Sequence, residues 1–282
     1  DTTTDLPQEF ANELGIKAMP LSFKMEDKNY YNYLDYREYP IDKFYSKLRE
    51  GKLAVTAQVN VSEFISAFKE YLDKGLDILY IAFSSGLSGT YNSAQVAAKE
   101  LREEYKDRKI YIIDSLAASM GEGLLVYHAV MKKREGLSID ELKDWLIENR
   151  NKLCHWFTVD DLHHLKRGGR VSSAAAVMGS MLGIKPVLHV DDEGHLIPVE
   201  KVRGRRKSLD RLVDHMEDSC IDPHNQVIFI SHGDCIDDVN YIKDQINKRL
   251  KPKDIVVNYV GPVIGSHSGP GTMALFFIGK QK

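Results

Sequence analysis

Two short, continuous apolar runs constrain the fold of this chain more than any other feature. They are 76–83 (LDILYIAF) and 109–114 (KIYIID), and both are rich in β-branched and aromatic residues. Runs that are apolar at successive positions are typical of strands buried on both faces of a parallel sheet. Segments with helical spacing follow each run, at 91–105 and at about 117–134. This βαβα series predicts a parallel α/β layer with right-handed crossovers.

The length of the chain, 282 residues, exceeds that of a common single-core domain of roughly 100–150 residues. A hairpin pattern at 186–202, turning at the DDEG of 191–194, interrupts the alternation of strands and helices in the second half. We therefore expect an α/β protein of two domains. Residues 1–155 would form a three-layer α/β/α domain with a parallel sheet, and residues 156–282 an α/β domain with a mixed sheet.

Other segments have weaker patterns. Residues 16–23 are expected as a strand, 27–39 as a polar, tyrosine-rich loop, and 174–182 as a helix of small residues and methionine. The first helix is expected at 8–14, with Asp5 as its N-cap. Because the chain starts at Asp1 in a polar segment, we also expect a buried strand to precede it. Residues 261–271 (GPVIGSHSGPG) are predicted as a loop that joins two strands.

Charge and cysteine usage narrow the class of protein. The formal net charge is −3, which does not favour a general binder of nucleic acid or of anionic membranes. The three cysteines, Cys154, Cys220 and Cys235, lack CxxC spacing and favour neither a disulfide scaffold nor a zinc site. No apolar stretch approaches the roughly 18 residues of a membrane span, and no signal sequence is evident. The cytoplasm is the expected location.

The segment SSGLSGT, residues 84–90, follows the first buried run and precedes a helix. Its glycines let backbone approach a ligand, its hydroxyls donate hydrogen bonds, and the amides of a helix start favour an anion. The segment is neither a Walker A loop nor a GxGxxG fingerprint. It therefore predicts either an anion cradle or simply a capped helix start.

A histidine and two basic clusters are further candidates. His267 stands among four glycines, where an imidazole binds an anion, acts as a base, or lies exposed on a turn. Basic residues gather at 166–170 (KRGGR) and at 201–207 (KVRGRRK). Such clusters usually lie on solvent-exposed faces of a protein, but they also bind phosphate groups or acidic partners.

Two pairs of possible metal ligands, each pair one helical turn apart, overlap in one segment. They are Asp160, Asp161, His163 and His164. Coordination normally needs three or four convergent ligands, and no further cluster completes the set. The alternative is an aspartate cap beside surface histidines, and we expect no metal.

Taken in order, several motifs resemble the DegV family of bacterial fatty-acid-binding proteins, whose best understood members are the FakB subunits of fatty acid kinase. The resemblance covers essentially the whole chain. It rests on DTTTDL (1–6), VTAQ (55–58), SSGLSGT (84–90), IDS (113–115), LKRGGRVS (165–172), IKP (184–186), KVR (201–203) and GSHSGPG (265–271). Ala57 and Val59 depart from the serine and proline that are usual in the second motif.

The resemblance implies a protein that holds one long-chain fatty acid, such as palmitate, stearate or oleate, in a tunnel between two domains. The carboxylate would be hydrogen-bonded by Thr56, Ser88 and His267. Arg170 and Arg203 would lie at the surface where an ATP-dependent kinase subunit docks and phosphorylates the carboxylate. The chain would then be a carrier without cofactor or catalytic residues of its own, with transient membrane contact left open.

The physical reading of the residues agrees, because a carboxylate at the mouth of an apolar tunnel needs hydroxyl, amide or imidazole donors. Met120, Met178 and Met181 are candidates for the tunnel wall or for ordinary core. Two other functions remain open. One is a lipid or ester hydrolase with Ser88 as nucleophile and His267 as base, although Ser88 is not in a GxSxG elbow. The other is a regulatory protein that senses a small anion.

Overall fold

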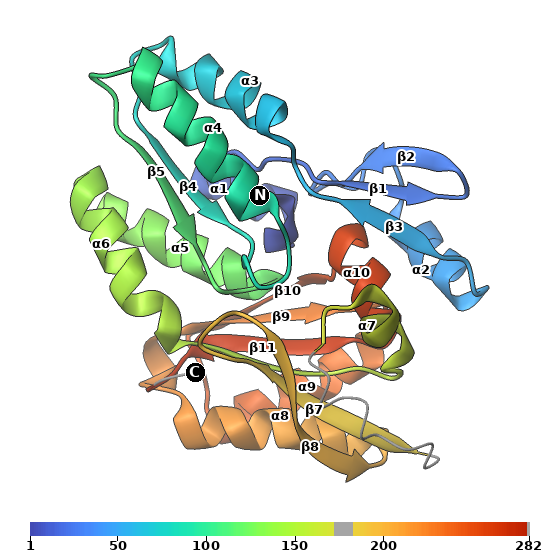
Figure 1. Ribbon diagram of the computed structural model, residues 1–282. Helices are drawn as coiled ribbons and strands as arrows, with labels where there is room; N and C mark the ends of the chain where they lie inside the picture. The colour runs from blue at the N-terminus through green and yellow to red at the C-terminus, as the bar shows by residue number, and fades with distance from the viewer. Residues whose placement is uncertain (172–182, 281–282) are drawn as a thin grey trace.

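The computed structural model describes residues 1–171 and 183–280 and contains three sheets. Their strand orders are β2-β1-β3, β4-β5 and β10-β9-β11-β6-β7-β8 (Figure 1). The strands are β1 Ser22–Met25, β2 Lys28–Tyr31, β3 Ala54–Ala57, β4 Ile78–Ala82, β5 Ile110–Asp114, β6 Leu153–Thr158, β7 Ile184–Val190, β8 Leu196–Arg203, β9 Val227–His232, β10 Asp254–Tyr259 and β11 Met273–Ile278. The α-helices are α1 Gln8–Leu14, α2 Ile41–Arg49, α3 Val61–Leu72, α4 Thr90–Glu104, α5 Met120–Arg134, α6 Ile139–Asn149, α7 His163–Gly168, α8 Arg205–Ser219, α9 Ile236–Arg249 and α10 Pro262–Ser268. Short 3₁₀ turns are η1 Thr2–Thr4, η2 Arg150–Lys152 and η4 Pro223–Asn225.

The parallel pair β4 and β5 forms the centre of an α/β/α layer, as the two apolar runs predict. Ile78 pairs with Ile110 and Ala82 with Asp114. Alternate side chains point to opposite faces, so Tyr80 and Ile112 pack in a cluster with α3 and α4. Ile81 and Ile113 pack in a different cluster with α5 and α6. Figure 1 shows the two helix pairs on either side of the strands.

A three-stranded antiparallel sheet lies beside this layer, and here two predictions were wrong. The strand expected at 16–23 is displaced to β1, and the loop expected at 27–39 contains β2. The turn between them consists of Glu26 and Asp27, both with positive φ (49° and 65°), as in the two-residue turns that match strand twist. The sequence pattern missed β2 because its residues are polar and mostly exposed.

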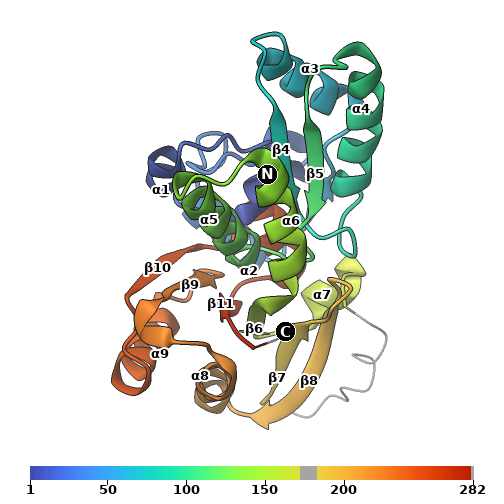
Figure 2. The same cartoon turned by 90° about the vertical axis from the view of Figure 1, so that its left-hand side faces the viewer.

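The six-stranded mixed sheet lies across the second half of the chain, as Figure 2 shows from the side. One face packs on α8 and α9, where Ile230 and Phe277 share a cluster with Leu212. The opposite face carries Phe229, Phe276 and Phe157 and joins α5 in one cluster. The predicted hairpin is confirmed as β7 and β8, which pair from Val190↔Leu196 to Ile184↔Arg203. The expected domain boundary after residue 155 falls inside β6, and the two-domain division stays a prediction.

The segment expected as a glycine-rich loop at 261–271 contains a helix, α10. It begins at Pro262, whose fixed φ and missing N–H suit the first helical position. Gly265 is needed for packing, because a Cβ there would lie 2.8 Å from the Tyr45 hydroxyl oxygen. The sequence-based prediction failed because glycine and proline were interpreted as turn signals. The predicted helix 174–182, with Met178 and Met181, lies outside the described residues.

Candidate functional site

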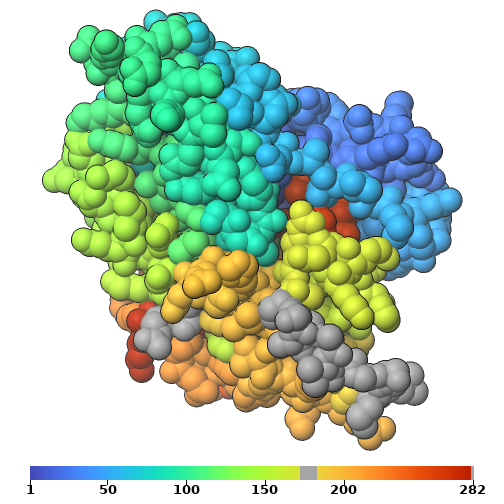
Figure 3. All heavy atoms as spheres, in the orientation of Figure 1, coloured from blue at the N-terminus to red at the C-terminus, as the bar shows by residue number. Residues whose placement is uncertain are grey.

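A cavity of about 400 Å³ lies between the mixed sheet and the N-terminal layer. Its floor comes from β6, β9 and β11, and its other walls come from the 84–90 loop, the start of α5, β3, α7 and α10. Most of its lining is apolar, including Phe83, Phe157 and Phe276. Figure 3 shows the opening as a hollow between β3 and α7, with α10 visible inside it.

The 84–90 loop is fixed against the β7–β8 turn. The Ser84 hydroxyl donates to the Gly194 carbonyl oxygen at 2.8 Å and accepts from the Gly86 amide at 3.2 Å. A Cβ on Gly86 would lie 3.0 Å from the His195 ring and 3.1 Å from two carbonyl oxygens of the turn. The loop that starts α4 is therefore held in place by contacts with the other half of the chain.

Ser88 lines the cavity at the start of α4. Its hydroxyl oxygen accepts from the Thr90 amide at 3.2 Å and lies 2.9 Å from the Thr90 hydroxyl oxygen. Gly89 between them leaves room for Gln58, since a Cβ there would clash with the Gln58 side-chain oxygen. Ser88 thus lies on the cavity wall and caps a backbone amide at the start of α4, and its role in an anion cradle stays a prediction.

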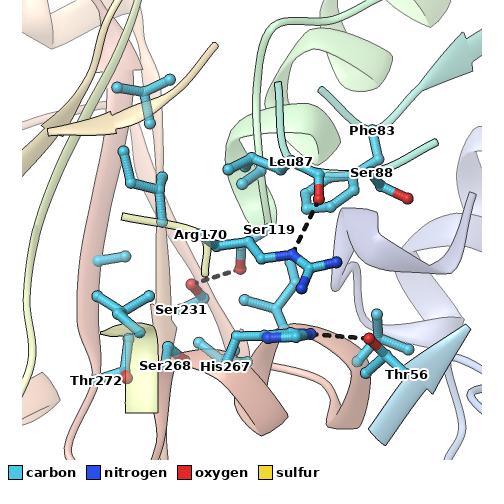
Figure 4. A pocket seen from close by; sticks show the side chains of 18 of the residues that line it. Thr56, Phe83, Leu87, Ser88, Ser119, Arg170, Ser231, His267, Ser268 and Thr272 are labelled. Carbon is cyan, nitrogen blue, oxygen red and sulfur yellow. Dashed lines mark hydrogen bonds between the residues drawn. The ribbon is translucent and has the colours of Figure 1, made fainter. Parts of the chain in front are cut away.

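His267, in the last turn of α10, lies 2.8 Å from Thr56 on β3, measured from Nε2 to Oγ1 (Figure 4). Its Nδ1 is buried and has no hydrogen-bond partner within the described chain. Burial, and to a lesser degree Arg170 and Arg167, lower the pKa of His267 to about 4. Without a ligand the imidazole is therefore neutral near pH 7, with one ring nitrogen bonded to Thr56 and the other buried without a partner among the described residues.

Arg170 follows α7 and also lines the cavity. Its Nε donates to the Leu87 carbonyl oxygen at 3.3 Å, and its Nη1 donates to that of Gly168. Figure 4 shows its guanidinium between Ser88 and the Thr56–His267 pair. The side chain is exposed at the cavity opening, so Arg170 is both a surface residue and part of the site. We call Thr56, Ser88, Arg170 and His267 the mouth cluster.

Arg203 is not brought to the cavity. It is exposed at the end of β8, paired with Ile184. Val171, next to Arg170, forms a bridge with Leu196 at the opposite end of that strand. At roughly 3.3 Å per residue, the two ends of β8 are about 23 Å apart.

A second polar group, of which two serines line the cavity, was not predicted from the sequence. Ser119 donates to Asp5 at 2.5 Å, and its hydroxyl oxygen lies 2.8 Å from that of Ser231. Asp5 was expected as the N-cap of α1, but Pro7 occupies that position and Asp5 lies buried at the end of η1. These residues are more than 110 positions apart, and no local motif signals their contact. We call Asp5, Ser119 and Ser231 the inner cluster.

Other candidates are engaged elsewhere. The Ser88 hydroxyl pairs with Thr90 and the imidazole with Thr56, so the nucleophile–base contact of a hydrolase is not formed between Ser88 and His267. Asp160 accepts from Lys185 at 2.9 Å, and His164 bonds Arg167 at 3.0 Å. In the described ranges, no three metal-ligating side chains gather into a group. Met120 is buried in the core and is not among the residues lining the cavity.

No helix between residues 1–171 or 183–280 is long and apolar enough to cross a bilayer.

A family model for uncharacterised proteins of the DegV family matches residues 1–280. The chain belongs to the DegV family. It is 48% identical to a DegV domain-containing protein of Clostridium perfringens over 282 residues, which cover 100% of this chain and 97% of that relative. It is 34% identical to the DegV domain-containing protein YteA of Lactococcus lactis, covering 100% of this chain and 96% of that relative.

Solved DegV structures share the fold. A protein from Thermus thermophilus, described as a fatty-acid-binding DegV family protein, matches with a TM-score of 0.89 at 29% identity, covering 99% of this chain and 97% of the other. A DegV lipid-binding protein from Thermotoga maritima matches with a TM-score of 0.87 at 29% identity, covering 100% and 97%. DegV from Bacillus subtilis, described as a fatty-acid-binding protein, matches with a TM-score of 0.83 at 28% identity, covering 99% and 97%.

Proposed function

We propose that this DegV protein binds one long-chain fatty acid, such as palmitate, stearate or oleate, in the cavity between the mixed sheet and the N-terminal layer. The observation that carries the proposal is the mouth cluster, which gathers polar side chains at one end of a largely apolar cavity. The descriptions of the Thermus and Bacillus relatives as fatty-acid-binding proteins support it.

The cavity suits an acyl chain on physical grounds. A volume of about 400 Å³ falls within the usual range of ligand pockets, about 300–1,000 Å³. Transfer of the chain from water contributes roughly 0.8 kcal/mol per buried CH₂. The aromatic floor and the roof residues Leu87 and Phe83 supply the apolar contacts.

The mouth cluster suits the carboxylate. A carboxylate removed from water must be hydrogen-bonded or neutralised. The hydroxyls of Thr56 and Ser88 and the imidazole of His267 supply hydrogen bonds, and the Arg170 guanidinium supplies the opposite charge. A carboxylate beside His267 would also raise the pKa of its imidazole above the value of the free protein.

We further propose that the bound fatty acid is phosphorylated by a partner kinase subunit and not by this chain. A carboxylate oxygen would attack the terminal phosphorus of ATP held by the partner, forming an acyl-phosphate and releasing ADP. Arg170 beside the opening and Arg203 at the far end of β8 would contact the partner. The carrier would bind no nucleotide and would work in the cytoplasm, where ATP is available.

The first experiment identifies the ligand. Protein purified from a bacterial host without added lipid is analysed by native mass spectrometry, and its organic extract by lipid mass spectrometry. We expect close to one long-chain fatty acid per protein. A lipid-free protein that also fails to bind oleate or palmitate in a titration would contradict the proposal.

The second experiment tests presentation to a kinase. Arg203→Ala is expected to leave fatty-acid occupancy unchanged and to slow acyl-phosphate formation when a bacterial fatty acid kinase and ATP are added. Lys143→Ala, on α6, is the matched control and should change neither quantity. An Arg203→Ala protein that is phosphorylated at the full rate would remove this residue from the docking surface.

A further inference from the structure

The inner cluster places hydroxyl groups on the wall of a cavity that an unsubstituted acyl chain would need to be apolar. Ser119 and Ser231 both line the cavity, with side chains 5% and 0% exposed. Figure 4 shows them joined by a hydrogen bond, with Ser231 on the side of the cavity away from Thr56. The hydroxyls therefore lie along the expected path of the chain and not at its carboxylate.

Strand register fixes where Ser231 lies on the floor. On β11, Ala274 pairs with Ser231 of β9 on one side and with Phe157 of β6 on the other. These three side chains form one row, and Phe276 lies in the next row. A chain that crosses this floor passes, in strand order, the Ser231 hydroxyl, the Ala274 methyl and the Phe157 ring.

Ser231 has unused hydrogen-bonding capacity. A hydroxyl has one donor and two acceptor sites, and the described contacts of the Ser231 hydroxyl consist of one bond, to Ser119. When Asp5 is ionised, Ser119 donates to it and Ser231 donates to Ser119, so the Ser231 oxygen can still accept. When Asp5 is protonated, the chain of donors can run in the opposite direction, and Ser231 can donate into the cavity. Burial raises the pKa of Asp5 to about 8, which favours the protonated form near pH 7.

Ser268 adds a second unused hydroxyl. Its side chain lines the cavity, is 4% exposed, and its oxygen has no hydrogen-bond partner among the described residues. In Figure 4 it lies on the same side as Ser231. The neighbouring Thr272, by contrast, donates to the Gly269 carbonyl oxygen at 2.8 Å. Two buried hydroxyls therefore have capacity for a polar group inside the cavity.

We propose that the preferred ligand is a fatty acid with a hydroxyl group in the interior of its acyl chain, which hydrogen-bonds Ser231. This inference rests on the proposed fatty-acid function and narrows it to a substrate class. A ligand hydroxyl can hydrogen-bond Ser231 in either protonation state of Asp5, because it can donate as well as accept. A plain CH₂ or a double bond at that position leaves the Ser231 hydroxyl with its bond to Ser119 alone.

The test compares stearate with hydroxystearates in delipidated protein. Dissociation constants are measured for stearate, 2-hydroxystearate, 10-hydroxystearate and 12-hydroxystearate. We expect the better of the two interior isomers to bind roughly tenfold tighter than stearate, since one added hydrogen bond to a buried group has about this effect. The 2-hydroxy acid, whose hydroxyl lies next to the carboxylate, should show no such gain.

Ser231→Ala supplies the decisive variant, because alanine already occupies the paired position 274 and fits the same row. It should abolish the preference for the interior hydroxyl and keep the affinity for stearate. Ser266→Ala is the control, since Ser266 is also buried but bonds the Pro262 carbonyl oxygen and does not line the cavity.

Equal binding of all four acids by the wild-type protein, or a preference that survives Ser231→Ala, overturns the inference while leaving the fatty-acid function intact. Failure to bind any of the four acids overturns the fatty-acid function, and this inference with it.

Discussion

The mouth cluster and the two serines of the inner cluster line one cavity, but the two clusters differ in the charge that they contain. The mouth cluster contains a guanidinium and a neutral imidazole, and its members are half-buried or exposed. The inner cluster contains a carboxyl group and two hydroxyls, all at least nine-tenths buried. Burial raises the pKa of Asp5 to about 8, whereas burial and two arginines lower that of His267 to about 4.

The difference shows how a chain can place polar groups in an apolar cavity at two depths. Near solvent, a side chain can remain positively charged and bind an anion, because water screens its charge while the site is empty. Deep in the protein, an uncompensated charge costs several kcal/mol, so the carboxyl group is protonated instead. The first arrangement favours a charged ligand end, and the second a neutral polar one.

Among binding measurements, the affinity for plain stearate should differ most between variants of the two clusters. Ser88→Ala and His267→Ala should each weaken stearate binding roughly 5- to 150-fold, because each leaves a buried carboxylate under-satisfied by about 1–3 kcal/mol. Ser231→Ala should change stearate affinity less than about twofold. Calorimetric titration of delipidated protein measures all three. Equal losses at both clusters would mean that the carboxylate does not lie at the mouth.

The free energy of unfolding should change with pH in opposite directions for Asp5 and His267, because their pKa shifts have opposite signs. Asp5 should give the larger change. Its native pKa, about 8, lies above its ordinary value of 3.8, so it stabilises the fold at low pH and loses this contribution as pH rises from about 4 to 8. Relative to Asp5→Asn, the wild type should therefore lose stability over that range, by at most about 6 kcal/mol. Urea unfolding at several pH values measures the difference. A difference that is constant with pH would place the Asp5 pKa near its ordinary value.

His267 should behave in the reverse sense. Its native pKa, about 4, lies below its ordinary value of 6.5, so its contribution is present above pH 6.5 and is lost as pH falls toward 4. Ligand-free wild type should lose stability relative to His267→Gln in that window, by at most about 3 kcal/mol. The same unfolding series on delipidated protein tests this. A gain of stability on acidification would mean that the native pKa of His267 is raised and not lowered.

The smallest expected effect distinguishes the two arginines. Because Arg170 helps to lower the pKa of His267, Arg170→Met should raise that pKa toward its ordinary value. Arg203→Met should leave it unchanged, since Arg203 is not at the cavity. A proton NMR titration of the His267 ring in ligand-free protein measures both. A shift with Arg203→Met would contradict the separation along β8.

Local patterns predicted the layer around β4 and β5, the SSGLSGT loop and the β7–β8 hairpin, because each is determined by residues close in sequence. Family resemblance assigned Thr56 and His267 to one carboxylate site although they lie 211 positions apart, but it did not predict the direct bond between them. Nothing in the sequence indicated the inner cluster, because one aspartate and two serines in separate segments do not form a motif with a recognisable spacing. Helix α10 was missed because its glycines serve close packing and not turns.

Helix α5 restricts the movements by which a ligand could enter and leave the cavity. Its side chains share one core with β4 and β5 above and with β6, β9 and β11 below. A hinge motion that separated the two sheets would expose that whole core to water, at a cost close to that of unfolding. Exchange of a bound molecule must therefore use smaller movements at the rim, around α7 and the 84–90 loop. The residence time of the ligand is then set by the local opening rate and is independent of the global unfolding rate.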